Sequence, residues 1–231
     1  MKRIVSIFLL TYPILVFTGC GHISTYQSPK ILNQGEKLWG TGISLNTNKE
    51  FINEFPMALL SDYSIYARYG LSDRAESGLK LSFSLPFLLA SSHYKYLLLQ
   101  TAPVKSMKKP LLVSGDLGLS IGLVSSGSPA VGFHPTLLFG REDFYGGVST
   151  NILYPFSSQH QYQNTPNSLI ILSSRIFAGT SMGENKWKFN PEISYDFFPY
   201  SGETVTIFHG QTTLPKGMIV VGFSIQRIFG E

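Results

Sequence analysis

The side chains best suited to acid–base chemistry are those of four histidines, His93, His134, His160 and His209. A hydrolytic or acyl-transfer site needs a nucleophile, a base and an orienting group within hydrogen-bond reach of one another. His134 lies in an alternating run, on the same side as Gly132 and Thr136, and other runs carry serines and aspartates on their corresponding sides. The sequence alone does not assign a serine to His134. His160 and His209 fall in long polar stretches, where an isolated histidine is usually solvated.

Other binding chemistries find little support. Histidine and cysteine do not recur at the close spacing of metal ligands. The segment GREDFYGG at 140–147 has the character of a hairpin turn and lacks the strand-to-helix context of a phosphate loop. The basic cluster KSMKKP at 105–110 is short and suits anionic headgroups or water. The net charge of +4 includes Lys2 and Arg3 and is too small to indicate a nucleic-acid partner. We therefore expect no metal, cofactor or nucleic acid, and a non-enzymatic role is favoured.

The first twenty residues, MKRIVSIFLLTYPILVFTGC, have the layout of a signal for export. Lys2 and Arg3 precede an apolar run over 4–17, which is too short to span a membrane as a helix and suits the apolar region of a signal peptide. Small residues then precede Cys20, the single cysteine of the chain. The chain therefore cannot form an internal disulfide, although export would permit one.

This layout resembles the bacterial lipoprotein signal, or lipobox, with Phe17 where that family usually has leucine. The resemblance implies that residues 1–19 are removed and that Cys20 becomes a lipidated N-terminus carrying fatty-acyl groups such as palmitate. The alternative is an ordinary signal peptide cut near Gly19 or Gly21, with Cys20 incidental. Residues 20–37 are polar and aperiodic, which predicts a tether. Residues 38–231 would then form the folded domain.

The composition of the chain favours a β-protein in or on a membrane. Charged residues make up only 14% of the chain, against about 25% in average soluble proteins. Aromatic residues reach 13%, there are 22 glycines, and no long apolar run follows the signal. These features point away from helical membrane proteins and suggest a β-protein in or on a membrane.

Alternation of apolar and polar residues starts at Leu38 and continues almost to the end of the chain. Most runs have 10 to 13 residues, which suits the tilted strands of a bilayer-spanning barrel. The sequence thus predicts an all-β fold, an antiparallel up-and-down β-barrel of the transmembrane type with about ten strands. The fourth and eighth runs are ambiguous, so eight to twelve strands are allowed. The expected strands are 38–47, 58–71, 74–85, 93–101, 111–123, 130–140, 143–154, 168–180, 186–198 and 217–229.

The polar face of these runs distinguishes a membrane barrel from a soluble one. A soluble barrel would turn that face to water and fill it with charges, whereas here glycine, serine, asparagine and threonine dominate. The scattered charges of both signs suit a crowded lumen in which ion pairs satisfy one another. A lining of one sign would instead have indicated an ion-selective pore. The expected lumen charges are Asp62, Arg68, Glu76, Lys80, Asp116, Arg175, Lys188 and Glu192.

The connections between the runs are alternately long and short, except that the one at 102–110 is longer than expected. In outer-membrane barrels the outer loops are long and the periplasmic turns short. An even number of strands returns both chain ends to the short-turn side, the periplasm. A lipid on Cys20 would then enter the inner leaflet of the outer membrane. The long connections at 48–57, 155–167 and 199–216 would face the surface and carry any binding function.

The phrase RYGLSDRAESGLKL at 68–81 resembles the strand–turn–strand phrases of bacterial outer-membrane β-barrel proteins. That resemblance implies insertion by the barrel-assembly machinery, outer-membrane lipid as the surroundings, and a structural, surface-binding or narrow-pore role with an unidentified surface ligand. Members usually end in phenylalanine, whereas here Phe229 stands two places before the end. Two alternatives remain. One is a soluble, lipid-anchored periplasmic barrel for a hydrophobic ligand. The other is a lipid A-modifying barrel enzyme, a membrane-embedded hydrolase or acyltransferase, with His134 as a candidate.

Overall fold

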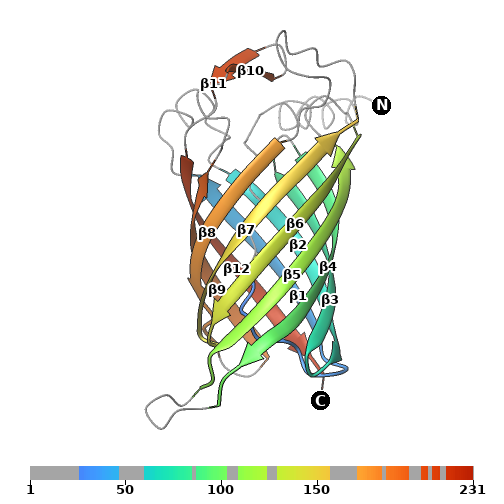
Figure 1. Ribbon diagram of the computed structural model, residues 1–231, viewed down its shortest axis with the longest axis vertical. Helices are drawn as coiled ribbons and strands as arrows, with labels where there is room; N and C mark the ends of the chain where they lie inside the picture. The colour runs from blue at the N-terminus through green and yellow to red at the C-terminus, as the bar shows by residue number, and fades with distance from the viewer. Residues whose placement is uncertain are drawn as a thin grey trace, which may run out of the picture.

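The computed structural model describes residues 26–46, 60–84, 87–102, 109–123, 129–156, 171–183, 186–197, 204–207, 210–213 and 217–230. Ten long strands form a closed barrel, shown in Figure 1. They are β1 (Lys37–Asn46), β2 (Leu60–Ser72), β3 (Ala75–Ser84), β4 (Phe87–Gln100), β5 (Leu112–Leu123), β6 (Pro129–Gly140), β7 (Phe144–Pro155), β8 (Ile171–Thr180), β9 (Trp187–Phe197) and β12 (Gly217–Phe229). Two short strands, β10 (Thr204–Ile207) and β11 (Gly210–Thr213), pair with each other beyond one end of the barrel.

Every strand pairs antiparallel with its neighbours in chain order, and β1 closes the ring by pairing with β12. Closure of the ring leaves no exposed sheet edge. Such closure is required where water is absent and cannot form hydrogen bonds with unpaired backbone groups. The predicted all-β, antiparallel, up-and-down barrel of ten strands is therefore confirmed. Among the described residues, no helix is long and apolar enough to cross a membrane.

One strand starts earlier than the sequence indicates. The fourth run was expected to begin at His93, with a medium loop before it, but β4 begins at Phe87. The six added residues alternate as a strand should: Leu88 and Ala90 point outward, and Leu89 is fully buried. Their weaker contrast between apolar and polar positions hid this periodicity. The hairpin of β10 and β11 was also not expected, because it falls within the predicted loop 199–216.

The two ends of the barrel differ. At one end lie Lys37, Phe229, the turns 73–74, 141–143 and 181–186, and the longer connection 101–111; we call it the short-turn end because three of its four connections are short. It is the lower end in Figure 1, where the C-terminus is marked. The opposite, long-loop end carries the connections 47–59, 156–170 and 198–216, although the connection between β3 and β4 there has only two residues. Both ends of the barrel sequence therefore lie on the short-turn side, as the even strand count predicts.

The outer surface of the barrel is apolar along its length. Side chains such as Leu79, Leu119 and Ile121 are 64 to 67% exposed, although they are strongly apolar. Aromatic residues gather near both rims, as outer-membrane girdles do. Trp39, Tyr69, Phe139, Phe144, Trp187 and Phe229 lie toward the short-turn end, and Tyr63, Phe83, Tyr154, Tyr195 and Phe197 toward the long-loop end. This surface has the apolar character expected of a side that faces lipid.

The inner surface is polar in its middle and apolar near the short-turn end. Leu38, Leu97, Leu112, Leu138, Tyr145 and Phe177 form the apolar layer, and all of them are buried. Above this layer the inward positions carry serines, asparagines and charged residues, most of them less than a tenth exposed. Burying so many charges is costly unless they are paired. The lumen must therefore hold partners for them.

Candidate functional site

The lumen of the barrel is occupied by the chain itself. Residues 26–36, which precede β1, are called the lumen segment: residues 26–32 lie inside the barrel, and residues 33–35 form an exposed turn at its short-turn end. Tyr26 is fully buried, and Gln27, Ile31 and Leu32 are less than a tenth exposed. The segment follows the barrel axis from the level of Ser44, where the Tyr26 hydroxyl lies 2.5 Å from Ser44 Oγ, to the short-turn end at Lys37. The sequence predicts a tether here, because the segment lacks periodicity.

Glycines in the barrel wall leave space for the lumen segment. At Gly42 on β1, an added Cβ would overlap the ring of Tyr26. At Gly70 on β2, it would overlap the backbone oxygen of Asn33. Glycine in a strand interior normally weakens the strand, and one recognised reason for it is the close approach of another backbone. The two glycines therefore shape the wall to the segment.

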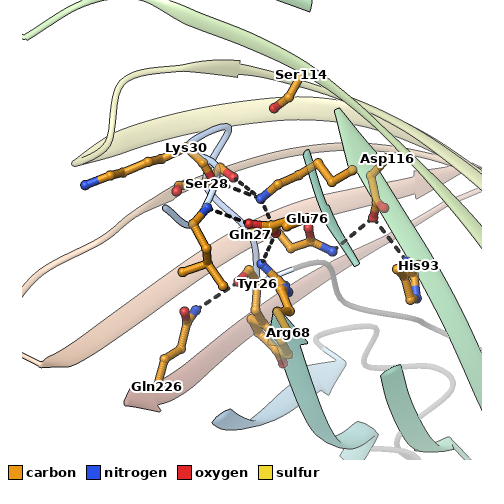
Figure 2. Close-up of polar contacts among 12 residues, drawn as sticks. Tyr26, Gln27, Ser28, Lys30, Arg68, Glu76, His93, Ser114, Asp116 and Gln226 are labelled. Atoms are coloured by element: carbon orange, nitrogen blue, oxygen red, sulfur yellow. Dashed lines mark hydrogen bonds and ion pairs between the residues drawn. The ribbon is translucent and has the colours of Figure 1, made fainter. Parts of the chain in front are cut away.

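Glu76 on β3 is the central charged group of the site, shown in Figure 2. Its carboxylate lies 2.7 Å from Lys95 Nζ and 3.6 Å from Arg68 Nη1. It also accepts a hydrogen bond from the backbone N–H of Leu32 at 2.8 Å. Glu76 and Lys95 are each 2% exposed. One buried carboxylate therefore joins two cations of the wall to the lumen segment.

Lys95 on β4 binds the lumen segment by its backbone carbonyls. Its ammonium donates to Lys30 O at 2.9 Å and to Ser28 O at 3.2 Å, while Ser114 Oγ donates to Pro29 O at 2.8 Å. A segment in an interior must have its backbone groups satisfied, and here side chains do this instead of a sheet ladder. These bonds require no particular side chain at 28–30, so no pattern of residue types predicts them.

Asp116 on β5 forms the opposite side of the cluster in Figure 2. Its Oδ2 accepts from Gln27 Nε2 at 3.0 Å and lies 3.1 Å from Nδ1 of His93. Across the lumen, Gln226 on β12 donates to Tyr26 O at 3.0 Å. The backbone N–H of Tyr26 donates to Glu192 on β9 at 3.1 Å. The segment therefore contacts walls that lie on opposite sides of the barrel.

Near the short-turn end the lumen segment is held by an exposed ion pair. Lys30 Nζ lies 3.0 Å from Oε1 of Glu142, and Lys188 Nζ lies 3.8 Å from the same atom. Beside this pair is a cavity of about 90 Å³, lined in part by Ile31, Asn190 and Gln226. At about 30 Å³ per water in the liquid, the cavity holds only a few waters.

Glu142 gives this end of the site a dependence on pH. Burial raises the pKa of its carboxyl, but the hydrogen bond from Lys30 and the charges of Lys30 and Lys188 lower it more, so the pKa lies below its usual value. A depressed carboxyl pKa stabilises the fold above the unfolded pKa, near 4.3, and the benefit is lost as the pH falls through the folded pKa. We expect Glu142→Gln to destabilise the barrel by at most about 1 kcal/mol at pH 7 and by less at pH 3.

Urea unfolding of both proteins in detergent, followed by tryptophan fluorescence at the two pH values, measures this difference. Asp143→Asn on the same turn is the matched control for the loss of one charge. An equal difference between wild type and Glu142→Gln at pH 7 and pH 3 would contradict the ion-pair explanation.

A second charged cluster lies in the lumen away from the lumen segment's carbonyls. Arg175 on β8 and Asp196 on β9 form a bidentate pair, with Nε to Oδ1 at 2.6 Å and Nη2 to Oδ2 at 3.2 Å. Both residues are 1% exposed. Lys80 Nζ lies 4.0 Å from Asp62 and 5.9 Å from the centre of the Tyr26 ring. The two clusters therefore combine charges of both signs inside the barrel.

The eight residues predicted as lumen charges have the following positions. Asp62, Glu76, Lys80, Asp116, Arg175 and Glu192 are buried inside the barrel. The Arg68 side chain is 10% exposed, and that of Lys188 is 21% exposed near the short-turn end. The sequence reasoning missed Lys95 and the lumen segment. Lys95 falls in the ambiguous fourth run, where continued alternation with His93 would have placed it on the polar face.

The remaining candidates divide into two groups. His93 and His134 lie on the lumen side of β4 and β6, where His93 contacts Asp116 and His134 contacts Ser120. Cys20, His160 and His209 fall outside the described residues. Within the described ranges, no group of three histidine, cysteine, aspartate or glutamate side chains is arranged to hold a metal ion.

Comparisons with known proteins add only distant likenesses. Models of known protein families give no match to the sequence. A comparison with curated proteins gives no match either. Among solved structures, the chain is similar to the N-terminal β-barrel domain of Pseudomonas aeruginosa OprF, with 11% identity, a TM-score of 0.33, and coverage of 86% of this chain and 100% of that one. It is also similar to the translocator domain of the autotransporter NalP from Neisseria meningitidis, with 11% identity, a TM-score of 0.31, and coverage of 86% and 90%.

Proposed function

We propose that this protein is an outer-membrane β-barrel whose lumen is closed by its own N-terminal segment. It serves as a membrane-embedded platform that presents its long-loop end to the cell surface, and it does not conduct solutes in this state. The observation that carries the proposal is the lumen segment, which is hydrogen-bonded to opposite walls of the barrel. The short-turn end would face the periplasm, as it does in outer-membrane barrels.

The apolar outer surface and polar inner surface of the barrel support a membrane location. Soluble monomers rarely expose continuous apolar patches larger than a few hundred Å². Here apolar side chains cover the outside of every barrel strand, with aromatic residues toward both rims. A soluble carrier of a hydrophobic ligand would need the reverse arrangement, with an apolar interior. The interior instead holds Glu76, Lys95, Arg175 and Asp196, all nearly inaccessible.

The contacts of the lumen segment support closure. A conducting pore of this size would leave its lining charges accessible to water and ions. Here Lys95 and Asp116 bind the lumen segment directly, and the cavity beside it is about 90 Å³. The charges inside are of both signs and closely paired, which offers little attraction to a permeating ion of either sign.

The export signal, the anchor and the partners belong to the same proposal. Removal of residues 1–19 and lipidation of Cys20 would attach the chain to the outer membrane. Outer-membrane lipid and the barrel-assembly machinery would be its partners, with no nucleic acid involved. Any ligand would bind at the long connections, since loops carried on a rigid barrel commonly hold the binding residues.

Conductance in planar lipid bilayers tests closure. We expect the wild-type barrel to insert without current steps, and a variant lacking residues 26–33 to give clear steps, because the deletion removes the occupant of the lumen. A variant lacking residues 21–25 is the control, since it shortens the same end of the chain but leaves the contacts from Tyr26 onward in place. Heat-modifiable migration on a gel establishes that each variant is folded. Equal steps from the wild type and from the 26–33 deletion would overturn the proposal.

A further inference from the structure

A row of polar side chains crosses five consecutive strands near the long-loop end of the lumen. The strand pairing places Lys80 opposite Ser91 and Ser91 opposite Ser120. The next two strands continue the row, because His134 contacts Ser120 and Asn151. The contacts described above account for Lys80, whose ammonium lies 5.9 Å from the centre of the Tyr26 ring, but not for the rest of the row. It therefore needs its own account.

The central three residues have the geometry of an activated nucleophile. Ser120 Oγ lies 2.6 Å from His134 Nε2, and His134 Nδ1 lies 3.1 Å from Asn151 Oδ1. An amide oxygen only accepts hydrogen bonds, so Nδ1 carries the imidazole proton and Nε2 offers a lone pair to the serine hydroxyl. Asn151 is itself oriented, because its Nδ2 donates to Ser173 Oγ at 3.3 Å. Nucleophile, base and orienting group are thus in series.

The backbone permits this approach at one position. Gly132 lies opposite Ser120 on β6, and a Cβ there would overlap Ser120 Oγ and stand 2.9 Å from His134 Nε2. The ladder between β6 and β7 is also interrupted at His134 and Pro135, which have no ladder partners on β7. A glycine therefore keeps the space in which the serine and the imidazole meet.

The surroundings indicate the kind of substrate. Ser120 is three residues from the end of β5, about 10 Å from the long-loop rim at 3.3 Å per residue. Between the row and that rim the lumen wall carries Leu89, Ala130 and Leu153, all at most 2% exposed. An apolar chain entering from the rim would meet these side chains first. On the other side of Ser120, Ser91 lies directly opposite in the pairing of β4 with β5, and its hydroxyl is the candidate donor to a developing oxyanion.

We propose that Ser120, His134 and Asn151 form an acyl-ester hydrolase site that takes carboxylic esters with an apolar acyl chain from the long-loop side. Ser120 Oγ bonds to the ester carbonyl carbon while its proton passes to His134 Nε2. The bond to the alcohol oxygen breaks, and the alcohol leaves with that proton. Water then attacks the acyl-serine by the same route, with His134 again taking and returning a proton, and the carboxylic acid is released. Asn151 acts as a positioning residue that holds the imidazole tautomer.

Covalent labelling of the full-length folded barrel in detergent with an alkyl fluorophosphonate tests this site. Attack by Ser120 on phosphorus would expel fluoride and leave one adduct, which peptide mass spectrometry locates. We expect a single adduct on Ser120, absent in Ser120→Ala. His134→Gln should lower the labelling rate by at least about 100-fold, as loss of a general base does. Ser82→Ala, which alters a fully buried lumen serine outside the row, is the control and should label like wild type.

Two further measurements separate a reactive site from a structural network. Gly132→Ala keeps all three side chains but forces Ser120 and His134 apart, so labelling should fall although heat-modifiable migration persists. Hydrolysis of p-nitrophenyl butyrate should be lost in Ser120→Ala, and Asn151→Ala should lower kcat with little change in KM, because it releases the imidazole orientation without touching the substrate. Absence of an adduct from the folded wild type, or undiminished labelling of Ser120 in His134→Gln, would overturn the proposal.

Discussion

Replacement of Arg175 by alanine is expected to destabilise the barrel by about 3–5 kcal/mol, since it leaves Asp196 buried without its guanidinium partner. The pair is bidentate, with a shortest distance of 2.6 Å, and both side chains are almost inaccessible. Breaking such a pair from one side costs far more than the pair itself contributes, because the remaining charge cannot return to water. Urea unfolding in detergent micelles, followed by tryptophan fluorescence and by gel migration, measures the loss.

The double variant Arg175→Leu with Asp196→Leu distinguishes this explanation from a loss of packing. Removing both charges together no longer leaves Asp196 ionised and buried without its guanidinium partner, so the double variant should be more stable than Arg175→Ala. Equal instability of the single and double variants would show that the cost arises from the lost volume of the arginine side chain, and the electrostatic explanation would fail.

Replacement of Glu76 by alanine is expected to open the lumen. Glu76 is the one wall carboxylate that joins Lys95, Arg68 and the backbone of Leu32 in the described cluster. Without it, two cations of the wall remain close together and uncompensated, at a cost of about 3–5 kcal/mol for a broken buried pair. Displacing the lumen segment admits water and counter-ions to these cations and relieves that cost. Planar bilayers should then show current steps that wild type lacks.

Current through the opened Glu76→Ala barrel should favour anions, because Lys95 and Arg68 would line the passage. Asp73→Ala, which removes an exposed negative charge from the neighbouring turn, is the control and should remain silent. If Glu76→Ala is destabilised as expected but shows no current steps, Glu76 stabilises the barrel wall without keeping the lumen closed, and this prediction is wrong.

The strands of the barrel wall were predictable because the alternation of apolar and polar residues is a short-range sequence pattern. Each strand places successive side chains on opposite faces, so eight residues of sequence already state which face is apolar. Leu117, Leu119 and Ile121 against Asp116, Gly118 and Ser120 on β5 show this directly. Antiparallel pairing with short turns then connects neighbours in chain order, and the even count sets both ends on one side.

The lumen segment was not predictable in this way, because most of the contacts that hold it in the lumen come from residues distant in sequence. Lys95 and Gln226 bind its carbonyls from 65 and 200 residues away. Hydrogen bonds to backbone groups do not require particular residue types, so the sequence of residues 26–33 has the aperiodic, polar character that predicts a tether. The row at Ser120 was predictable only in part. Alternation placed His134 on the polar face, but its neighbours depend on the register between β5 and β6, which the sequence pattern does not determine.

The position of the lumen segment has a consequence for the order of assembly. The ring closes only when β12, the last strand, reaches β1, the first one. The segment lies immediately before β1, and its partners come from both halves of the chain: Glu76, Lys95 and Asp116 early, Glu192 and Gln226 late. It can therefore bind the early strands while the sheet is still open and then present Tyr26 to the late strands. In this order of assembly, the segment that closes the lumen of the finished barrel would also be the template around which the sheet closes.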